Sequence, residues 1–277
     1  MSLATARSLL FAPGNDEHRL EKALAAGADA VVADLEDAVP AGEKEAARAV
    51  TRRVLAGARS GCLVAVRVNA VGSAHWESDL HAFAGVELDA VVLPKATPDA
   101  AVALGPEGPP IVAIVETAMG VRRAYETALE PRVAALVLGA VDLGLELGLE
   151  PRADGQEVLY ARSVLVVDST AAGIRSPFDL VHVDTSDDEG LEVEALLARS
   201  LGFRGKVCIH PAQVEIVNRV FSPSREDGER ARRVVEAYER GLADGRGAVA
   251  LDGEMIDLPV VERARRILAE TERSASE

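Results

Sequence analysis

Short apolar runs recur along this chain, and a polar residue ends or soon follows most of them. The clearest is IVAIV at 111–115, which Glu116 follows at once. A continuous run of this kind, rich in Val and Ile, is typical of a strand buried on both faces, as in parallel sheets. Segments of helical pattern separate eight such runs, which lie at 8–12, 30–34, 63–68, 90–94, 111–115, 134–139, 180–183 and 207–209.

Eight strand–helix units in a chain of 277 residues predict an α/β fold, a (β/α)8 TIM barrel, which needs about 250 residues. No GxGxxG follows the first run, so a dinucleotide-binding fold has no support. The barrel, as the catalytic domain, is expected to occupy residues 1–221. Residues 222–277 carry helical patterns at 225–242 and 260–273 and predict a C-terminal helical extension. An appendage of this kind often packs on a neighbouring subunit.

The formal net charge of −15 argues against binding to a nucleic-acid backbone, which requires basic patches. The two cysteines, Cys62 and Cys208, lie in or beside apolar runs and indicate buried thiols rather than a disulfide framework. The sequence shows no secretory leader and no apolar run near the ~20 residues of a membrane span. We therefore expect a cytoplasmic protein that binds small molecules and neither nucleic acid nor membranes.

Polar side chains gather where the predicted strands end. Because the carboxyl ends of barrel strands share one face, these side chains are expected to ring one mouth of the barrel. They are Asp34, Glu36, Arg67, Asn69, Lys95, Glu116, Asp142, Asp184 and His210. Glu116 and Asp142 follow neighbouring strands and are expected to share one Mg²⁺, an ion that usually takes one or two carboxylates and several waters. The alternative is that one of the two pairs with an arginine. No His/Cys cluster has zinc spacing.

Three further residues of this predicted mouth carry chemistry of their own. The planar guanidinium of Arg67 could hold a carboxylate through two bonds or polarise a carbonyl oxygen, and its alternative role is an ion pair with Asp34 or Glu36. Lys95 would suit a Schiff-base aldolase, but no neighbour in the sequence lowers the pKa of its amine. His210 precedes a proline and is either a general base or a hydrogen-bonding residue of the interior.

Taken together, these segments resemble the citrate lyase β-subunit-like branch of the HpcH/HpaI aldolase superfamily. The matching pieces follow in the expected order over nearly the whole chain. They are RSLLFAPG at 7–14, DLEDAV at 34–39, RVN at 67–69, LPK at 93–95, VETAMG at 115–120, GAVDL at 139–143, CIHPAQ at 208–213 and MIDLP at 255–259. Each piece is a weak signal alone, and their combination is specific.

The resemblance implies a (β/α)8 barrel, a homotrimer or hexamer, and Mg²⁺-dependent cleavage or formation of a carbon–carbon bond next to an acyl thioester. The metal ligands of the family fall on Glu116 and Asp142, and its substrate-binding arginine falls on Arg67, which would stabilise the developing oxyanion. Gly139, which opens the segment that carries Asp142, is expected to contact the substrate together with Glu116. Asp257 falls on an acid/base that in relatives reaches the active site of a neighbouring subunit, and from sequence alone it also suits a helix N-cap.

Coenzyme A is the expected thioester carrier, and Arg19 and Lys22 are expected to contact its phosphates; a solvated helix face is the alternative for each. The expected reaction converts a β-hydroxyacyl-CoA, such as malyl-CoA or citramalyl-CoA, into acetyl-CoA and a 2-oxo acid. Three alternatives stay open, namely a citryl-ACP lyase subunit of citrate lyase, an acyl-CoA thioesterase and a catalytically silent scaffold. Relatives commonly carry Glu where Val141 stands, and the run VVDS at 166–169 also departs from their pattern.

Overall fold

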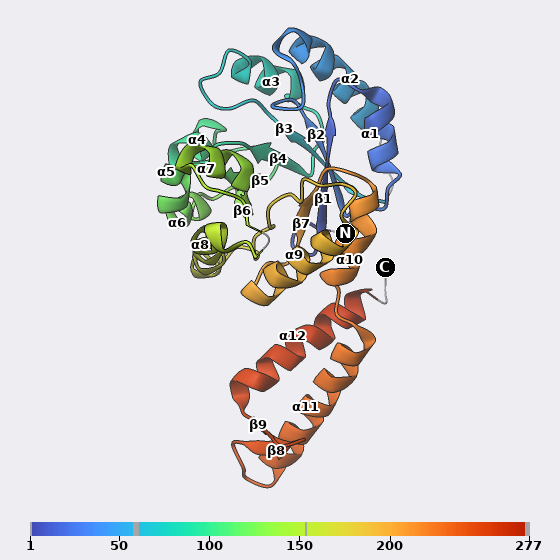
Figure 1. Cartoon of the computed structure of the whole chain (residues 1–277), viewed down its shortest axis with the longest axis vertical. Helices are drawn as coiled ribbons and strands as arrows, with labels where there is room; N and C mark the ends of the chain where they lie inside the picture. The colour runs from blue at the N-terminus through green and yellow to red at the C-terminus, as the bar shows by residue number, and fades with distance from the viewer. Residues whose placement is uncertain (1, 58–60, 153, 275–277) are drawn as a thin grey trace. The chain divides into compact units, whose positions relative to one another are not determined.

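The computed structural model describes residues 2–57, 61–152 and 154–274. The chain divides into two compact units, Met1–Phe221 and Ser222–Glu277. The first holds a parallel sheet with helices around it, and the second consists of two long helices and a hairpin (Figure 1). Within the described ranges no helix is both long enough and apolar enough to cross a membrane.

One curled parallel sheet of seven strands, in the order β6-β5-β4-β3-β2-β1-β7, organises the first unit (Figure 1). Its strands are β1 (Ser8–Pro13), β2 (Ala30–Asp34), β3 (Leu63–Arg67), β4 (Ala90–Leu93), β5 (Ile111–Val115), β6 (Val133–Leu138) and β7 (Lys206–Cys208). Seven of the eight predicted strands are thereby confirmed to within one residue at each end. β2, β4 and β5 are buried at every position, which explains why unbroken apolar runs marked them.

Helices follow most of the strands and cover the outer face of the sheet (Figure 1). Local signals set their ends. The side chain of Asp16 accepts a hydrogen bond from the N–H of Arg19, and Thr97 and Thr117 begin two later helices in the same way. The helices are α1 (Glu17–Leu24), α2 (Lys44–Gly57), α3 (Trp76–Phe83), α4 (Pro98–Ala103), α5 (Ala118–Arg122), α6 (Ala124–Ala128), α7 (Ala140–Leu147), α8 (Leu159–Ala171), α9 (Asp188–Leu201) and α10 (Ala212–Val220), with short 3₁₀ turns at Ala41–Glu43 and Gln156–Val158.

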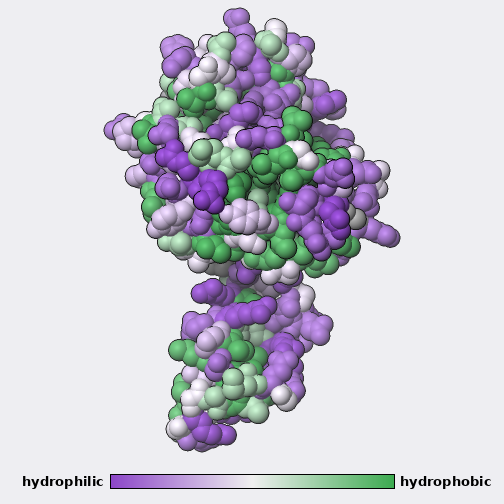
Figure 2. All heavy atoms as spheres, turned by 60° about the vertical axis from the view of Figure 1, so that its left-hand side comes forward, coloured by the Kyte–Doolittle hydropathy of each residue, from purple (hydrophilic) through white to green (hydrophobic). Residues whose placement is uncertain are grey.

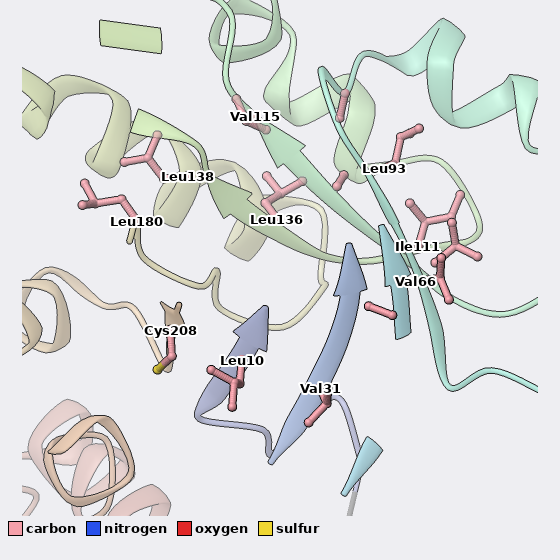
Figure 3. Close-up of a cluster of buried hydrophobic side chains, with 14 of the residues drawn as sticks. Leu10, Val31, Val66, Leu93, Ile111, Val115, Leu136, Leu138, Leu180 and Cys208 are labelled. Atoms are coloured by element: carbon pink, nitrogen blue, oxygen red, sulfur yellow. The ribbon is translucent and has the colours of Figure 1, made fainter. Parts of the chain in front are cut away.

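The sheet buries two separate layers because successive side chains of a strand point to opposite faces. In β5, Ile111, Ala113 and Val115 join a cluster that includes helix residues, whereas Val112 and Ile114 join a second cluster. The first cluster fills the space between sheet and helices (Figure 3). The second draws on all seven strands and, among the described buried residues, on no helix, so it lies inside the curl of the sheet.

The strand predicted at 180–183 is absent, and this prediction is wrong. Slightly earlier, Phe178 pairs with Val137 of β6 and Asp179 pairs with Lys206 of β7, each through a single parallel bridge. The N–H groups of Phe178 and Asp179 donate to carbonyls of β6 and of the loop before β7 at 2.9 and 2.8 Å. The apolar pattern continues beyond the point where the two strands offer backbone partners, so it misplaced the pairing. A bridging segment thus links the two edges of the sheet.

Two helices and a hairpin build the second unit, as α11 (Arg225–Ala243), β8 (Val249–Leu251), β9 (Glu254–Ile256) and α12 (Leu258–Ser274). Both helices were predicted, and α11 begins with a capping box between Ser224 and Asp227. The hairpin turns at Asp252 and Gly253, whose φ angles of 53° and 85° are typical of a tight two-residue turn. A small core holds the unit together, formed by Ala231, Val234, Tyr238, Ile256, Val261 and Ala264.

Candidate active site

A cavity of about 450 Å³ opens at the carboxyl ends of the strands of the first unit. Its lining includes five residues predicted for the site, namely Arg19, Arg67, Glu116, Gly139 and Asp142. Strand residues of the inner cluster, such as Ile114 and Val137, form apolar parts of the wall. The sequence pattern therefore predicted residues from several strands that the fold brings to one cavity.

Glu116 directly follows β5 and is only 5% exposed. Its Oε1 accepts a hydrogen bond of 2.6 Å from the backbone N–H of Lys95. Burial raises the pKa of the Glu116 carboxyl, and the Lys95 N–H and the charges of Lys95 and Arg67 offset only part of that effect. A buried carboxylate that lacks sufficient positive charge is well suited to bind a cation.

Gly139 makes room for the Glu116 carboxylate. A Cβ atom on residue 139 would lie 2.5 Å from the Cβ of Glu116 and 2.7 Å from its Oε2, too close for any larger side chain. α7 begins immediately after Gly139, and Asp142 lies in its first turn. Since β5 and β6 are adjacent in the sheet, the close approach at Gly139 brings the two carboxylate-bearing segments together.

Lys95 follows β4 and contacts both Glu116 and Asp142. Its ammonium donates to Asp142 Oδ2 at 2.9 Å and lies 3.6 Å from Glu36 Oε1 and 3.9 Å from Glu116 Oε1. Burial would lower the pKa of Lys95, but the hydrogen bond to Asp142 and the charges of Glu36 and Glu116 outweigh it and raise that pKa. A Schiff base requires the neutral amine, so this environment disfavours that chemistry.

Arg67 ends β3 opposite Asp34 of β2, and the two side chains form a two-bond ion pair with N–O distances of 2.6 and 2.7 Å. Its Nη1 lies 3.1 Å from Glu36 and 3.2 Å from Asp37, and its guanidinium stacks 5.5 Å from the centre of the Phe11 ring. The ion pair anticipated as an alternative role is therefore present. Because Arg67 also lines the cavity, Asp34 holds it in a position from which it can contact a ligand.

Glu36 is a residue of the mouth to which the sequence assigned no chemical role of its own. It is buried beside Arg67 and Lys95. Burial raises its pKa to about 7, against the lowering effect of Arg67, while the charges of Asp37 and Glu116 raise it further. Its place in the DLED stretch after β2 was the available signal, but the sequence could not show that Asp34, Glu36 and Asp37 all pair with Arg67.

The donors at this mouth fit a hard divalent cation. Glu116 and Asp142 both lie within 4 Å of the Lys95 ammonium, so a single positive charge already reaches both carboxylates. Within the described part of the chain, no group of three or more His, Cys, Asp or Glu side chains is arranged around a metal position. Two carboxylates with room for waters and a substrate suit Mg²⁺, which rarely occupies an all-protein cage.

Other predicted mouth residues do not line this cavity. Asn69 donates its side-chain N–H to Asp79, and Asp184 accepts from the N–H and hydroxyl of Ser186. His210 is exposed, and its Nδ1 accepts from the N–H of Ala212 at 3.2 Å. Asn69 and His210 lie just beyond strand ends as predicted, whereas the strand expected before Asp184 is absent. All three side chains form hydrogen bonds with residues close to them in the sequence.

The two residues expected to contact coenzyme A differ in position. Arg19 lines the cavity and pairs with Asp16 at 3.2 Å, and its side chain remains largely exposed. Lys22 is exposed on α1 and does not line the cavity. The structure therefore places a cation at the rim of the cavity in Arg19, and it places Lys22 on the surface nearby in α1.

Asp257 belongs to the second unit. It precedes α12, and its Oδ1 accepts a hydrogen bond of 3.3 Å from the N–H of Val260. The anticipated N-cap role is therefore present. The residue is partly exposed.

Comparison with known proteins gives consistent matches. The family model described as HpcH/HpaI aldolase/citrate lyase matches residues 7–211. A (3S)-malyl-CoA thioesterase of Cereibacter sphaeroides is 38% identical over 98% of this chain and 96% of its own length. Both matches extend across all the strands of the sheet, and the second extends across the helical unit as well.

Solved structures agree with this result. CitE from Mycobacterium tuberculosis in complex with magnesium, acetoacetate and coenzyme A superposes with a TM-score of 0.85 at 37% identity, over 98% of this chain and 100% of that chain. The citrate lyase β subunit of M. tuberculosis complexed with oxaloacetate and magnesium gives a TM-score of 0.72 at 39% identity, over 80% of this chain and 100% of that chain.

Proposed function

Because the chain belongs to the HpcH/HpaI aldolase/citrate lyase family, we propose that it is a Mg²⁺-dependent carbon–carbon lyase acting on a β-hydroxyacyl-CoA. A substrate such as malyl-CoA or citramalyl-CoA would yield acetyl-CoA and a 2-oxo acid. The observation that carries this proposal is that Glu116 and Asp142 both lie within 4 Å of the Lys95 ammonium, beside Arg67, in a cavity at the strand ends. The magnesium and oxaloacetate bound to the M. tuberculosis relative support it.

Glu116 and Asp142 would hold the Mg²⁺. When bound, the ion supplies Lewis-acid polarisation of a substrate oxygen and a template for the 2-oxo or 2-hydroxy acid portion. Gly139 keeps the space beside Glu116 open for both carboxylate and substrate. Burial destabilises the negative charge of Glu116 and so raises its pKa. The same destabilised charge favours the binding of a metal cation.

Arg67 would bind the substrate and stabilise the negative charge that develops on its oxygen. Its two-bond ion pair with Asp34 fixes the guanidinium plane before the substrate arrives, so little reorganisation is needed during the reaction. In the lyase direction the β-hydroxyl loses its proton and becomes the carbonyl of the 2-oxo acid. The carbon–carbon bond breaks, and its electron pair forms the enolate of the acetyl thioester, which then takes up a proton at carbon.

Asp257 is our candidate for the acid that protonates this enolate, and for the base in the reverse condensation. The catalytic barrel of residues 1–221 would receive it from the extension of a neighbouring copy, residues 222–277, in a homotrimer or hexamer. In the same proposal the bridging segment at Phe178 and Asp179 takes the eighth position of a closed (β/α)8 barrel. Arg19 and Lys22 would contact the coenzyme A phosphates, as cations on one helix beside the cavity.

Exposed apolar side chains support an assembly of several copies. α5 contacts both α7 and α8, and the three helices expose Met119, Leu145 and Tyr160 to solvent. Figure 2 brings forward the side on which these helices lie in Figure 1 and shows hydrophobic residues among hydrophilic ones. Light scattering coupled to size-exclusion chromatography tests the assembly, because a trimer or hexamer is expected and a monomer at micromolar concentration would contradict it.

The reaction is tested by incubating the protein with malyl-CoA and citramalyl-CoA, with Mg²⁺ or with EDTA, and identifying products by mass spectrometry. We expect acetyl-CoA and the 2-oxo acid with Mg²⁺ and neither with EDTA. Asp142→Asn should abolish this activity. Asp154→Asn, a change in an exposed ion pair with Arg152, serves as the matched control and should not affect it. Activity that survives complete metal removal would refute the proposal.

A thioesterase is the second candidate, because the relative from C. sphaeroides that matches nearly the whole chain carries that name. In this reaction an activated water would attack the thioester carbonyl. The same incubation separates the two activities, since a thioesterase releases free coenzyme A and the intact acid without acetyl-CoA. A citryl-ACP lyase would instead require an acyl carrier protein substrate, and a silent scaffold would turn over neither thioester.

A further inference from the structure

Lys95 has structural features that the proposed reaction does not use. Its φ of 49° lies in the left-handed region, which among the described residues other than glycine recurs only at Asp252. In this conformation the backbone N–H of Lys95 donates to Glu116 Oε1 at 2.6 Å, while its ammonium donates to Asp142 Oδ2 at 2.9 Å. One residue therefore holds both proposed metal ligands through two different atoms.

The ammonium of Lys95 occupies the acidic centre of the mouth. It lies 3.6 Å from Glu36 and 3.9 Å from Glu116, in addition to its bond to Asp142. Arg67, the other cation here, already gives two N–H groups to Asp34. The Lys95 ammonium is therefore the charge that balances Asp142 and partly balances its two acidic neighbours.

We infer that the Lys95 ammonium competes with the divalent cation for Asp142 and so limits the cation affinity of the site. The inference rests on the proposed function, because it takes Glu116 and Asp142 as the metal ligands. The ammonium lies 2.9 Å from Asp142 Oδ2, so a metal ion bound to the same carboxylate would stand close to a second positive charge. Two cations at one pair of carboxylates also repel each other strongly in a partly buried setting.

The side chain of Lys95 is built for such an exchange. It is 44% exposed and carries its charge on a flexible four-carbon stem, so the ammonium can leave Asp142 without disturbing the core. Glu36, the next carboxylate within reach, offers an alternative partner at 3.6 Å. The backbone N–H on Glu116 stays in place during this movement, because the β4 end and its left-handed turn hold it.

A second consequence concerns the protein without its cation. Asp142, Glu36 and Glu116 repel one another, and the Lys95 ammonium offsets that repulsion. Removing the ammonium should therefore destabilise the cation-free protein and strengthen its response to the cation, since a ligand stabilises the folded state according to its affinity. Cation affinity and cation-free stability are expected to change in opposite directions.

Titration calorimetry with MnCl₂ and with MgCl₂ tests this inference. Lys95→Met should bind either ion about tenfold more tightly than the unmodified protein, as removal of one competing charge near the site predicts. Lys95→Gln should behave like Lys95→Met, and Lys95→Arg should stay close to the unmodified protein. Arg53→Met, which removes a cation from an exposed pair with Glu17, is the matched control and should leave the affinity unchanged. Equal or weaker binding by Lys95→Met and Lys95→Gln would overturn the inference.

Asp142→Asn separates failure of this inference from failure of the proposed function. If Asp142→Asn binds the ion as well as the unmodified protein does, the proposed metal site is wrong and the inference falls with it. If Asp142→Asn loses binding while Lys95→Met does not gain it, the metal site stands and only the competition is refuted. Thermal melting gives the second readout, in which Lys95→Met should melt lower without the cation and show the larger rise on its addition.

Discussion

The first unit contains two clusters of basic and acidic side chains, which balance their charges differently. The buried cluster lies between the sheet and the helices and consists of Arg162, Asp179, Glu194 and Lys206. The mouth cluster lies at the strand ends and consists of Asp34, Glu36, Asp37, Arg67, Lys95, Glu116 and Asp142. In the first, two cations meet two carboxylates; in the second, two cations meet five.

The buried cluster pairs its charges internally, although Nη1 of Arg162 has no hydrogen-bond partner among the described residues. Arg162, Asp179 and Lys206 have side chains that are 0% exposed, and the two cations lie 2.9 Å from the same carboxylate. Burial would raise the pKa of Asp179, but the charges of Lys206 and Arg162 outweigh it and lower that pKa. Its charges are paired and only Glu194 is partly exposed, at 23%, so the cluster has a structural role.

The mouth cluster retains an excess of negative charge. Burial raises the pKa of both Glu36 and Glu116 in spite of Arg67 and Lys95 nearby. Such groups are stabilised by a proton or by an added cation. The difference shows that unbalanced charge at an accessible cavity, rather than the presence of ion pairs, distinguishes a binding site from a structural network.

Breaking the buried cluster should have the largest effect on stability. Asp179→Ala leaves two buried cations without their shared carboxylate and should lower the free energy of unfolding by about 3–5 kcal/mol. Urea denaturation measures this change. Asp154→Ala, which breaks the exposed pair with Arg152, is the control and should stay within about 0.5 kcal/mol. A loss below 1 kcal/mol for Asp179→Ala would show that the buried charges are not tightly paired.

The corresponding change in the mouth cluster should lower activity and leave stability intact. Glu116→Gln removes a proposed metal ligand and should lower kcat/KM for the lyase reaction by about 10³-fold, which corresponds to several kcal/mol of lost transition-state stabilisation. Its stability should remain or rise, because a neutral amide replaces a buried carboxylate whose pKa is raised. Glu192→Gln, in an exposed pair with Arg219, controls for general loss of charge. If Glu116→Gln unfolds, Glu116 has a structural role like that of the buried cluster.

Gly139 offers a test of the geometry at the mouth. Gly139→Ala places a Cβ 2.5 Å from the Cβ of Glu116, and the shift it forces should cost about 1–3 kcal/mol of stability and weaken Mg²⁺ binding. Gly144 lies within α7, the helix that begins after Gly139, and a Cβ there would have its nearest contact 3.9 Å away. Gly144→Ala should therefore be neutral or stabilise the protein by about 0.5–1 kcal/mol. Equal effects of the two changes on calorimetric Mg²⁺ affinity would contradict the account.

The smallest expected effect is a pH dependence from Glu36. Burial raises the pKa of Glu36 to about 7 in the folded protein, from its ordinary value of 4.5. Between these values the folded state binds more protons than the unfolded chain, so the stability contributed by Glu36 falls as pH rises from about 5 to 7. Cation-free Glu36→Gln should lose this slope, by about 1–2 kcal/mol over the range. Thermal or urea unfolding measures the free energy of unfolding against pH. Equal slopes for the unmodified protein and Glu36→Gln would refute the prediction.

Much of the fold could be predicted because burial on both faces leaves a continuous apolar signal. The runs before Asp34, Arg67 and Glu116 ended within one residue of the observed strands, and this placed the polar residues at one edge. The strand at 180–183 failed because a bridging segment is defined by backbone partners on β6 and β7, which hydrophobicity does not encode.

The site was predictable to the extent that a residue type and a strand end define it. Glu116, Asp142 and Arg67 met that condition. The position of Lys95 between two carboxylates depends on a left-handed φ and on side-chain reach, and neither is visible in the sequence. Arg162, on α8, gave no signal either, because only the packing of that helix against the sheet shows that an arginine is buried there.

Anomalous diffraction from crystals grown with Mn²⁺ in place of Mg²⁺ would show whether Glu116 and Asp142 hold the metal ion. We expect one strong peak at the mouth, within about 2.0–2.3 Å of an oxygen of Glu116 and an oxygen of Asp142, which is typical of direct coordination. We also expect that the Lys95 ammonium no longer contacts the Asp142 oxygen it bonds in this structure. A peak elsewhere in the molecule, with Glu116 and Asp142 still bound to Lys95, would contradict this expectation.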